Sequence, residues 1–478
     1  MIGQKLTKIL QSLKPDEFRR LKRAVNSPYF ATNSRLLDLY NYLRKYYPDF
    51  AEEKLQKEKL YKKLYPGKPF NDGVLRVLIR EFTVVVEDFM LLERMRSDKH
   101  LRKRTLVKEY GKRRLFEYFR KGTFELLDET EMEHVADMEH YRERVALYQD
   151  YCFHELSDVF QKSDDSLEKM MDSLDRYFIL AKYRFVQILR NANIINKKKA
   201  TYRFFDVVKN NRGNILENNE LVILYELINQ LHETNDEKYF FELKKLLFPV
   251  IEKIRKTDRR IIFYLGLNFC SRQFRFGKTE YIGESLDWYK KGLDSKFLLL
   301  RNETITDVTF SNIVKVACYE KEYTWAEDFI EKYNRYLKDN IREDALTYSK
   351  ATLCIERKEF VQAIRLLSNN IYGSRYHFKI RVALVKAAFE QALIDPQYHN
   401  FLQSAIESYA KYLQRDTTNS DHRTIPVKNF LKITEGLAKR ILAREDKDNI
   451  INWFNKKVHA DKEVELKFWL KEKVKNLK

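Results

Sequence analysis

Glycine and proline are scarce in this chain, which has 478 residues but only 12 glycines and 8 prolines. Average usage would supply about 7% glycine and 5% proline. Both residues mark turns and interrupt helices, because glycine is conformationally free and proline lacks a backbone N–H. Their scarcity argues against a loop-rich fold and predicts long helices joined by short connections.

Cysteine and long apolar runs are also scarce. The four cysteines, at positions 152, 270, 318 and 354, stand far apart and form no C-x-x-C pair. This spacing does not suggest a disulfide framework, so we expect reduced thiols and a cytoplasmic location. The longest apolar stretch, TVVVEDFMLL, contains two acids and is far short of a membrane span. The first residues, MIGQKLTKILQSLKPDEF, lack the apolar block and cleavage site of a secretion signal, so no membrane contact is expected.

Sequence motifs typical of catalytic, phosphate-binding and metal-binding sites are missing too. Gly277-Lys278-Thr279 resembles the end of a phosphate-binding loop, but Arg272 stands where that loop needs a glycine. Gly277 is therefore expected to end a helix at a hairpin turn. The segments EMEH and DMEH end at His134 and His140, which a single helix would place about 120° apart. No G-x-S-x-G motif occurs. We predict a non-enzymatic protein with no catalytic residue, metal or cofactor.

Apolar residues instead recur at helical spacing along most of the chain. In NDGVLRVLIREFTVVVEDFMLL, Asn71 or Asp72 is the expected helix cap. One buried stripe is predicted to follow at Val74, Leu78, Phe82, Val85, Phe89 and Leu92. Residues 166–195 predict one long helix, and residues 219–232 and 237–254 predict a helical hairpin.

We therefore predict an all-α fold in three parts. Residues 1–97 form a basic N-terminal helical domain, residues 98–200 form connecting helices, and residues 201–478 form a solenoid of helical hairpins. The last part contains four similar segments, at 284–293, 325–334, 362–371 and 404–413. Each has a small residue near its start and a larger apolar residue four positions later, which lets a paired helix approach closely. The small residues are Ser285, Ala326, Ala363 and Ala405, and the larger ones are Tyr289, Ile330, Leu367 and Tyr409.

Two of these segments begin with E-Y-T-W-A and E-F-V-Q-A, so that Tyr323 precedes Ala326 and Phe360 precedes Ala363 by three residues. In this respect residues 260–415 resemble tetratricopeptide repeats, although the spacing is longer and irregular. The resemblance implies a TPR-like α-solenoid, whose concave surface binds peptides or protein surfaces. The leading hypothesis is an interaction scaffold that binds a protein or peptide partner. The groove residues expected on the exposed side of first helices are Asn312, Lys315, Tyr348 and Lys350.

The N-terminal part suggests an alternative function. KEKLYKKLYPGKPFNDGVLRVLIREF loosely resembles the helix-turn-helix core of bacterial winged-helix regulators, some of which carry TPR-like C-terminal domains. The resemblance implies a DNA- or RNA-binding regulator in which Arg76 and Arg80 face the bases and Lys62, Lys63 and Lys68 contact phosphates. A core helix of a small bundle explains the same apolar stripe. The N-terminal part contains NSPYF, LY, LYPGKPFND and LR in this order, and in this it also resembles uncharacterised bacterial proteins. That resemblance implies no particular activity.

Charge is the last strong signal, because the net charge of +20 is unevenly distributed. Residues 1–120 contain 29 basic and 15 acidic side chains, whereas residues 121–180 contain 6 basic and 16 acidic ones. The basic block can serve an anionic partner, with Lys112 and Arg113 as nucleic-acid contacts, or can face the acidic block. Basic residues in 101–121 point in several directions on a helical wheel and form no single basic face. We therefore favour packing against residues 125–175.

Overall fold

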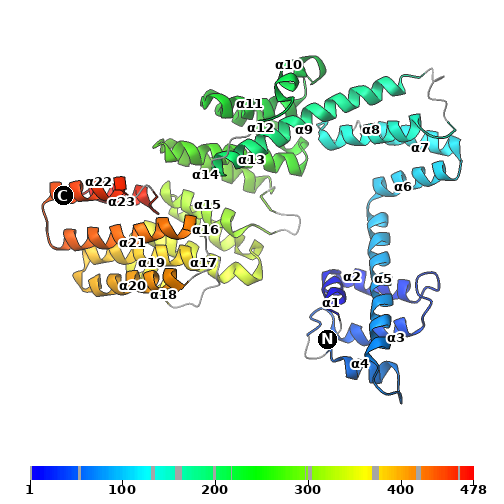
Figure 1. The fold of residues 1–478 in the computed structure, drawn as a ribbon, viewed down its shortest axis with the longest axis horizontal. Coiled ribbons are helices and arrows are strands. Elements are labelled where there is room, and N and C mark those ends of the chain that lie inside the picture. Colours follow the sequence, from blue (N-terminus) through cyan, green and yellow to red (C-terminus); the bar gives the residue numbers. More distant parts are fainter. Residues whose placement is uncertain are drawn as a thin grey trace. The chain divides into compact units, whose positions relative to one another are not determined.

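The computed structural model describes residues 3–51, 55–130, 135–156, 164–196, 201–216, 218–296, 298–299, 304–368, 376–415, 421–460 and 463–477. Every regular element within these ranges is a helix, and no strand occurs there (Figure 1). The predicted all-α fold is confirmed. Contacts divide the chain into two compact units, Met1–Phe178 and Ile179–Lys478. The division lies inside α9 (Ser166–Asn196), the long helix predicted at residues 166–195.

The first unit begins with five helices that share one core. They are α1 (Gln4–Ser12), α2 (Pro15–Val25), α3 (Arg35–Leu43), α4 (Lys57–Leu64) and α5 (Asp72–Ser97). Asn71 caps α5, because its side chain accepts a hydrogen bond from the Val74 backbone N–H at 3.1 Å. Leu78, Phe82, Val85 and Phe89 are buried as the helical spacing predicted. Val74 was predicted in the same stripe but is 40% exposed, because the first turn of α5 directs the neighbouring Leu75, which is 0% exposed, into the core instead.

Three further helices complete the described part of this unit before α9, namely α6 (Lys99–Lys112), α7 (Phe116–Thr130) and α8 (Met138–Cys152). The break between α6 and α7 follows Gly111 closely, and Arg114 there adopts a left-handed conformation with φ 59°. The Leu115 N–H donates to the Tyr110 carbonyl, and the Arg114 N–H donates to the Gly111 carbonyl. These two bonds close the end of α6 and turn the chain back, so that α7 packs against α6.

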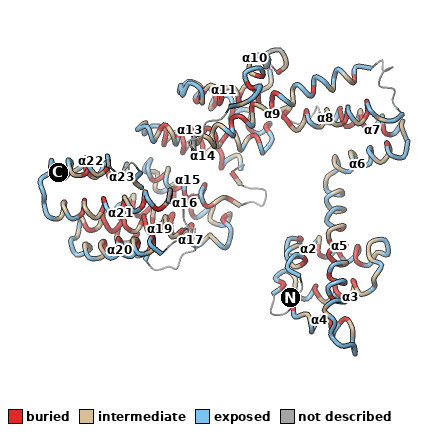
Figure 2. The backbone as a smooth tube through the Cα atoms, in the orientation of Figure 1, coloured by how far each residue is buried: buried red, intermediate tan, exposed pale blue. Residues whose placement is uncertain are grey.

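The second unit contains the remaining helices. They are α10 (Phe205–Leu216), α11 (Glu220–Thr234), α12 (Lys238–Val250), α13 (Lys256–Arg275), α14 (Glu280–Asp294), α15 (Asp307–Tyr319), α16 (Tyr323–Tyr333), α17 (Asp339–Glu356), α18 (Phe360–Ser368), α19 (His377–Ile394), α20 (His399–Arg415), α21 (Asp421–Leu442), α22 (Lys447–Ala460) and α23 (Lys467–Lys475). Most of these helices pack against a neighbour in the chain, as in the pairs α13–α14, α17–α18 and α19–α20, and α15 packs most extensively against α17. Buried residues follow the facing sides of these helices (Figure 2). The arrangement is consistent with a helical solenoid.

The described residues of the four similar segments lie on α14, α16, α18 and α20, the second helices of successive hairpins, except that Asn334 follows the end of α16. Ala326 and Ala363 have no exposed surface, and the larger residues that follow four positions later are also buried. A methyl side chain at these two positions leaves room for the paired helix to approach. In α16 and α18 the repeated pattern therefore marks the contact side of the second helix.

Candidate functional site

A pocket of about 940 Å³ lies in the second unit. Its walls come from the first helices of successive hairpins, α13, α15, α17 and α19, with additions from α14, α21 and residues 465–469. Aromatic and aliphatic side chains dominate the lining, and Lys315, Lys379 and Lys386 bring positive charge to it. A mostly apolar hollow with a few charged groups is the usual composition of a ligand or peptide site.

Two of these lysines contact the ring of one buried tyrosine. Tyr348 of α17 is 6% exposed. The Lys315 ammonium from α15 lies 5.3 Å from the centre of the Tyr348 ring, and that of Lys379 from α19 lies 5.9 Å from the same centre. Lys379 also lies 5.3 Å from the centre of the Tyr376 ring. Attraction between a cation and an aromatic face strengthens when water is excluded, so these rings hold both ammonium groups at the pocket wall.

Lys315 is the cation best placed to meet an anionic ligand. Burial lowers the pKa of its ammonium group, but the Tyr348 phenol and the carboxylates of Glu465 and Glu356 outweigh burial and raise that pKa above its usual value. The side chain therefore stays charged at neutral pH. It forms no direct ion pair within the described residues, whereas Lys386 is paired with Glu356 at 2.7 Å. The carboxylates of Glu465 and Glu356 act on Lys315 without a direct ion pair, so its ammonium group can still pair with a further carboxylate.

The structure places the four predicted groove residues in two groups. Lys315 and Tyr348 line the pocket, whereas Asn312 and Lys350 are exposed and lie outside its lining. The prediction that Tyr348 is on the exposed side was wrong, because its ring is buried under Lys315 and Lys379. Helical spacing did not show which side chains of α17 line the pocket.

Residues from the C-terminal segment complete the wall, and no sequence pattern predicted them. Trp469 is 7% exposed, and its ring packs against Phe389 at a centroid distance of 5.2 Å. The indole Nε1 donates a hydrogen bond of 2.8 Å to Glu390, and the Lys473 ammonium lies 2.7 Å from the same carboxylate. Glu390 and Trp469 are 79 positions apart, so no local pattern could pair them. The one available signal was the adjacent aromatic pair F-W inside a strongly charged segment.

The thiols of this unit lie in protected surroundings. Burial raises the pKa of Cys270, which lines the pocket, to about 12. Burial likewise raises the pKa of Cys318 to about 12 and that of Cys354 to about 11. The thiolate is the reactive form of cysteine, and at neutral pH these groups remain protonated. Cys270 is therefore not an activated thiol at the pocket wall.

The other motifs examined in the sequence take structural positions. Gly277 has φ 93° and directly follows Phe276, the C-cap of α13, so it ends that helix at the α13–α14 turn as predicted. Asp137 caps α8 by accepting a 2.8 Å hydrogen bond from the His140 N–H. His134 lies outside the described residues. No group of three or more His, Cys, Asp or Glu side chains suited to a metal ion occurs in the described part of the chain.

The predicted nucleic-acid contacts of the N-terminal region are exposed. Lys62 and Lys63 extend from α4, Lys68 lies in the following turn, and Arg76 and Arg80 lie on α5. Arg76 is paired with Asp72 at 2.6 Å. Helix α5 also supplies a large part of the core of α1–α5. It thus serves as the central helix of a small bundle as well as carrying these cations.

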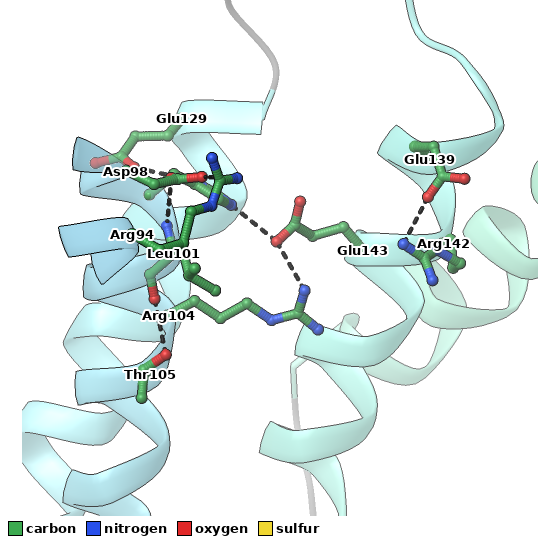
Figure 3. Close-up of polar contacts among 10 residues, drawn as sticks. Arg94, Asp98, Leu101, Arg104, Thr105, Glu129, Glu139, Arg142 and Glu143 are labelled. Carbon is green, nitrogen blue, oxygen red and sulfur yellow. Dashed lines mark hydrogen bonds and ion pairs between the residues drawn. The ribbon is translucent and has the colours of Figure 1, made fainter. Parts of the chain in front are cut away.

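The basic segment 101–122 faces acidic residues of α7 and α8. Lys103 lies 2.6 Å from Glu129, and Figure 3 shows Arg104 of α6 directed at Glu143 of α8, at 3.2 Å. Lys108 likewise lies 3.0 Å from Asp150. The predicted contact between the basic and acidic blocks is therefore present.

Lys112 and Arg113, named as nucleic-acid contacts, are exposed and both pair with Glu109 of their own helix. Much of the charge in this segment thus has a counter-charge within the same unit. The pairs are partly exposed, so each contributes little stability alone.

The fold and the site define an all-helical protein whose second unit has a pocket lined by the first helices of its hairpins, consistent with a helical solenoid. No helix in the described residues is long and apolar enough to cross a membrane. No model of a known protein family matches the chain, and no curated protein or solved structure was found to be similar.

Proposed function

We propose that this protein is a non-enzymatic interaction scaffold, and that the pocket in its second unit binds a segment of a partner protein. One observation carries the proposal, namely the position of Lys315 in a largely apolar pocket without a direct ion pair among the described residues. A peptide residue that offers an apolar body and a carboxylate would satisfy both features. Buried apolar contact would supply affinity, and the charge would select the partner.

The proposal includes a TPR-like architecture for residues 260–415. The fully buried Ala326 and Ala363 three residues after Tyr323 and Phe360 support it, because the tetratricopeptide pattern needs a small residue there. In such arrays the first helices of each hairpin form the concave binding surface. The pocket lies on the corresponding helices of this chain, α13, α15, α17 and α19.

A cytoplasmic location is part of the same proposal. It is supported by the four cysteines, all of which are buried and none of which forms a disulfide. Protected thiols of this kind suit a reducing compartment, where disulfides are rare.

Affinity capture with the full chain tests the proposal. Lys315→Glu reverses the charge at the pocket, and Lys350→Glu makes the same change on an exposed residue of α17 outside it. We expect the wild type and Lys350→Glu to retain the same partner and Lys315→Glu to lose it. Equal capture by all three chains would show that the pocket is not the binding site.

A second candidate is a nucleic-acid-binding regulator. The observation that favours it is a group of exposed cations without ion pairs among the described residues, namely Lys62, Lys63, Lys68 and Arg80. Cations of this kind supply attraction to phosphates that is independent of sequence. The basic segment 101–122 contributes less to this candidate, because acids of α7 and α8 already face it.

A further inference from the structure

The last described segment, residues 463–477, lies along the helices that form the pocket; we name it the C-terminal arm. Asn429 of α21 donates a 2.9 Å hydrogen bond to the Glu463 carbonyl, and the Glu465 N–H donates to the Pro426 carbonyl at 3.0 Å. Leu466 then adopts a left-handed conformation with φ 50°, and α23 begins at the next residue. Together with Trp469, the side chains of Glu465, Leu466 and Phe468 form one wall of the pocket.

Contacts made by side chains hold the arm in place more than its backbone hydrogen bonds do. Trp469 inserts between α19 and α21, with its ring 5.2 Å from Phe389 and 6.1 Å from Phe430. Phe468 reaches α13, where its ring centre lies 5.5 Å from that of Phe274, yet Phe468 remains 45% exposed. A nine-residue helix is too short to be stable alone, so the arm depends on these contacts to stay in place.

The arm also supplies negative charge to the pocket. Glu465 is one of the carboxylates that act on Lys315, the cation that we assign to a partner. Glu465 therefore offers the groove a carboxylate, and Phe468 and Trp469 follow it with aromatic surface three and four residues later. These are the features expected of the partner under the proposed function.

We propose that the C-terminal arm is a displaceable wall of this pocket, and that a partner segment with a carboxylate followed by aromatic residues takes its place. The inference rests on the proposed function, since it concerns the same pocket. A tethered segment competes at an effective concentration in the millimolar range. If the arm alone binds with a dissociation constant of about 10 μM, tethering weakens an external competitor by about 100-fold.

A fluorescein-labelled peptide of residues 463–477 provides the probe. It is titrated into the full chain and into a release variant, Lys473→Glu with Phe468→Ala. Lys473→Glu replaces attraction to Glu390 with repulsion, and Phe468→Ala removes the contact with Phe274. Lys471→Glu is the matched control, because Lys471 is exposed on the same helix and forms no ion pair among the described residues. Thermal unfolding of each chain, followed by circular dichroism, confirms that it is folded.

We expect the release variant to bind the peptide at least about 10-fold more tightly than the wild type and Lys471→Glu. A peptide carrying Trp469→Ala should not bind. Equal affinity for all chains, or no binding to a folded release variant, would overturn the inference and identify the arm as a permanent part of the fold. The proposed function is judged separately, because its own test is whether Lys315→Glu loses the partner that the wild type captures.

Discussion

The ammonium group of Lys315 lies 5.3 Å from the centre of the buried Tyr348 ring. Lys379 approaches the same ring from another helix, so one phenol ring positions cations from α15 and α19. Each such contact contributes about 0.5–2 kcal/mol, depending on how far water is excluded. The lysine heads are therefore arranged before a partner arrives, which lowers the entropy lost on binding.

Close helix packing in the second unit predicts that replacing two helical glycines with alanine changes stability in opposite directions. A Cβ atom at Gly266 of α13 would lie 2.4 Å from the Trp288 ring, whereas one at Gly283 of α14 would meet only Glu320, at 3.4 Å. Gly266→Ala should destabilise the protein by about 1–3 kcal/mol through overpacking. Gly283→Ala should stabilise it by up to about 1 kcal/mol, because alanine favours the helix. Urea unfolding measures both, and equal effects would contradict the packing described.

The basic segment predicts a salt-dependent loss of stability. Lys103 lies near both Glu125 and Glu129, so Lys103→Glu removes two attractions and adds repulsion. We expect a loss of about 1 kcal/mol at low salt and a smaller loss at high salt. Arg102→Glu makes the same charge change at an exposed site with no ion pair among the described residues, and should change stability by less than about 0.5 kcal/mol. Thermal unfolding at two salt concentrations distinguishes them, and equal losses would argue against charge pairing.

A buried histidine predicts acid sensitivity of the second unit. Burial, with Arg272 and Arg190 nearby, lowers the pKa of His232 to about 3 from its usual 6.5. Above pH 6.5 neither state binds the proton, and below it the unfolded chain binds a proton that the folded one does not. Stability therefore falls as the pH drops from 6.5 towards 3, by about 2 kcal/mol at pH 5.

His232→Gln should remove this part of the pH dependence, as measured by urea unfolding at pH 7 and pH 5. His459→Gln, at an exposed position of α22, should leave it unchanged. A variant at position 232 as acid-sensitive as the wild type would contradict the burial of this imidazole.

Nucleic-acid binding is tested with the full chain and labelled duplex DNA. If the scaffold proposal is correct, fluorescence anisotropy shows no tight, salt-dependent binding. The combined variant Lys62→Glu, Lys63→Glu and Lys68→Glu then behaves as the wild type does. Tight binding that weakens steeply with salt and disappears in this variant would favour the second candidate.

Local patterns in the sequence predicted much of the fold. The helix at residues 166–195, the Asn71 cap and the turn at Gly277 all follow from signals within a few residues. The contact of Lys103 and Arg104 with the acidic block followed from the charge distribution alone. These features depend on local backbone preferences or on long-range charge, both of which are visible in one sequence.

The pocket could be predicted only in part. Lys315 was identified because the first helices of the hairpins were recognised, but the burial of Tyr348 depends on the position of α19 against α17. The contact of Trp469 with Glu390 joins segments 79 residues apart. Such contacts arise from tertiary packing and leave no periodic trace in either segment.

Site-specific photo-crosslinking tests the scaffold proposal most directly. A photoreactive residue replaces Thr352, which lines the pocket, or Lys350, which lies outside it on the same helix. We predict that the Thr352 position crosslinks to a partner segment, that Lys315→Glu abolishes this crosslink, and that the Lys350 position gives none. Equal crosslinking at both positions, or a Thr352 crosslink that persists with Lys315→Glu, would contradict the proposal that this pocket binds the partner.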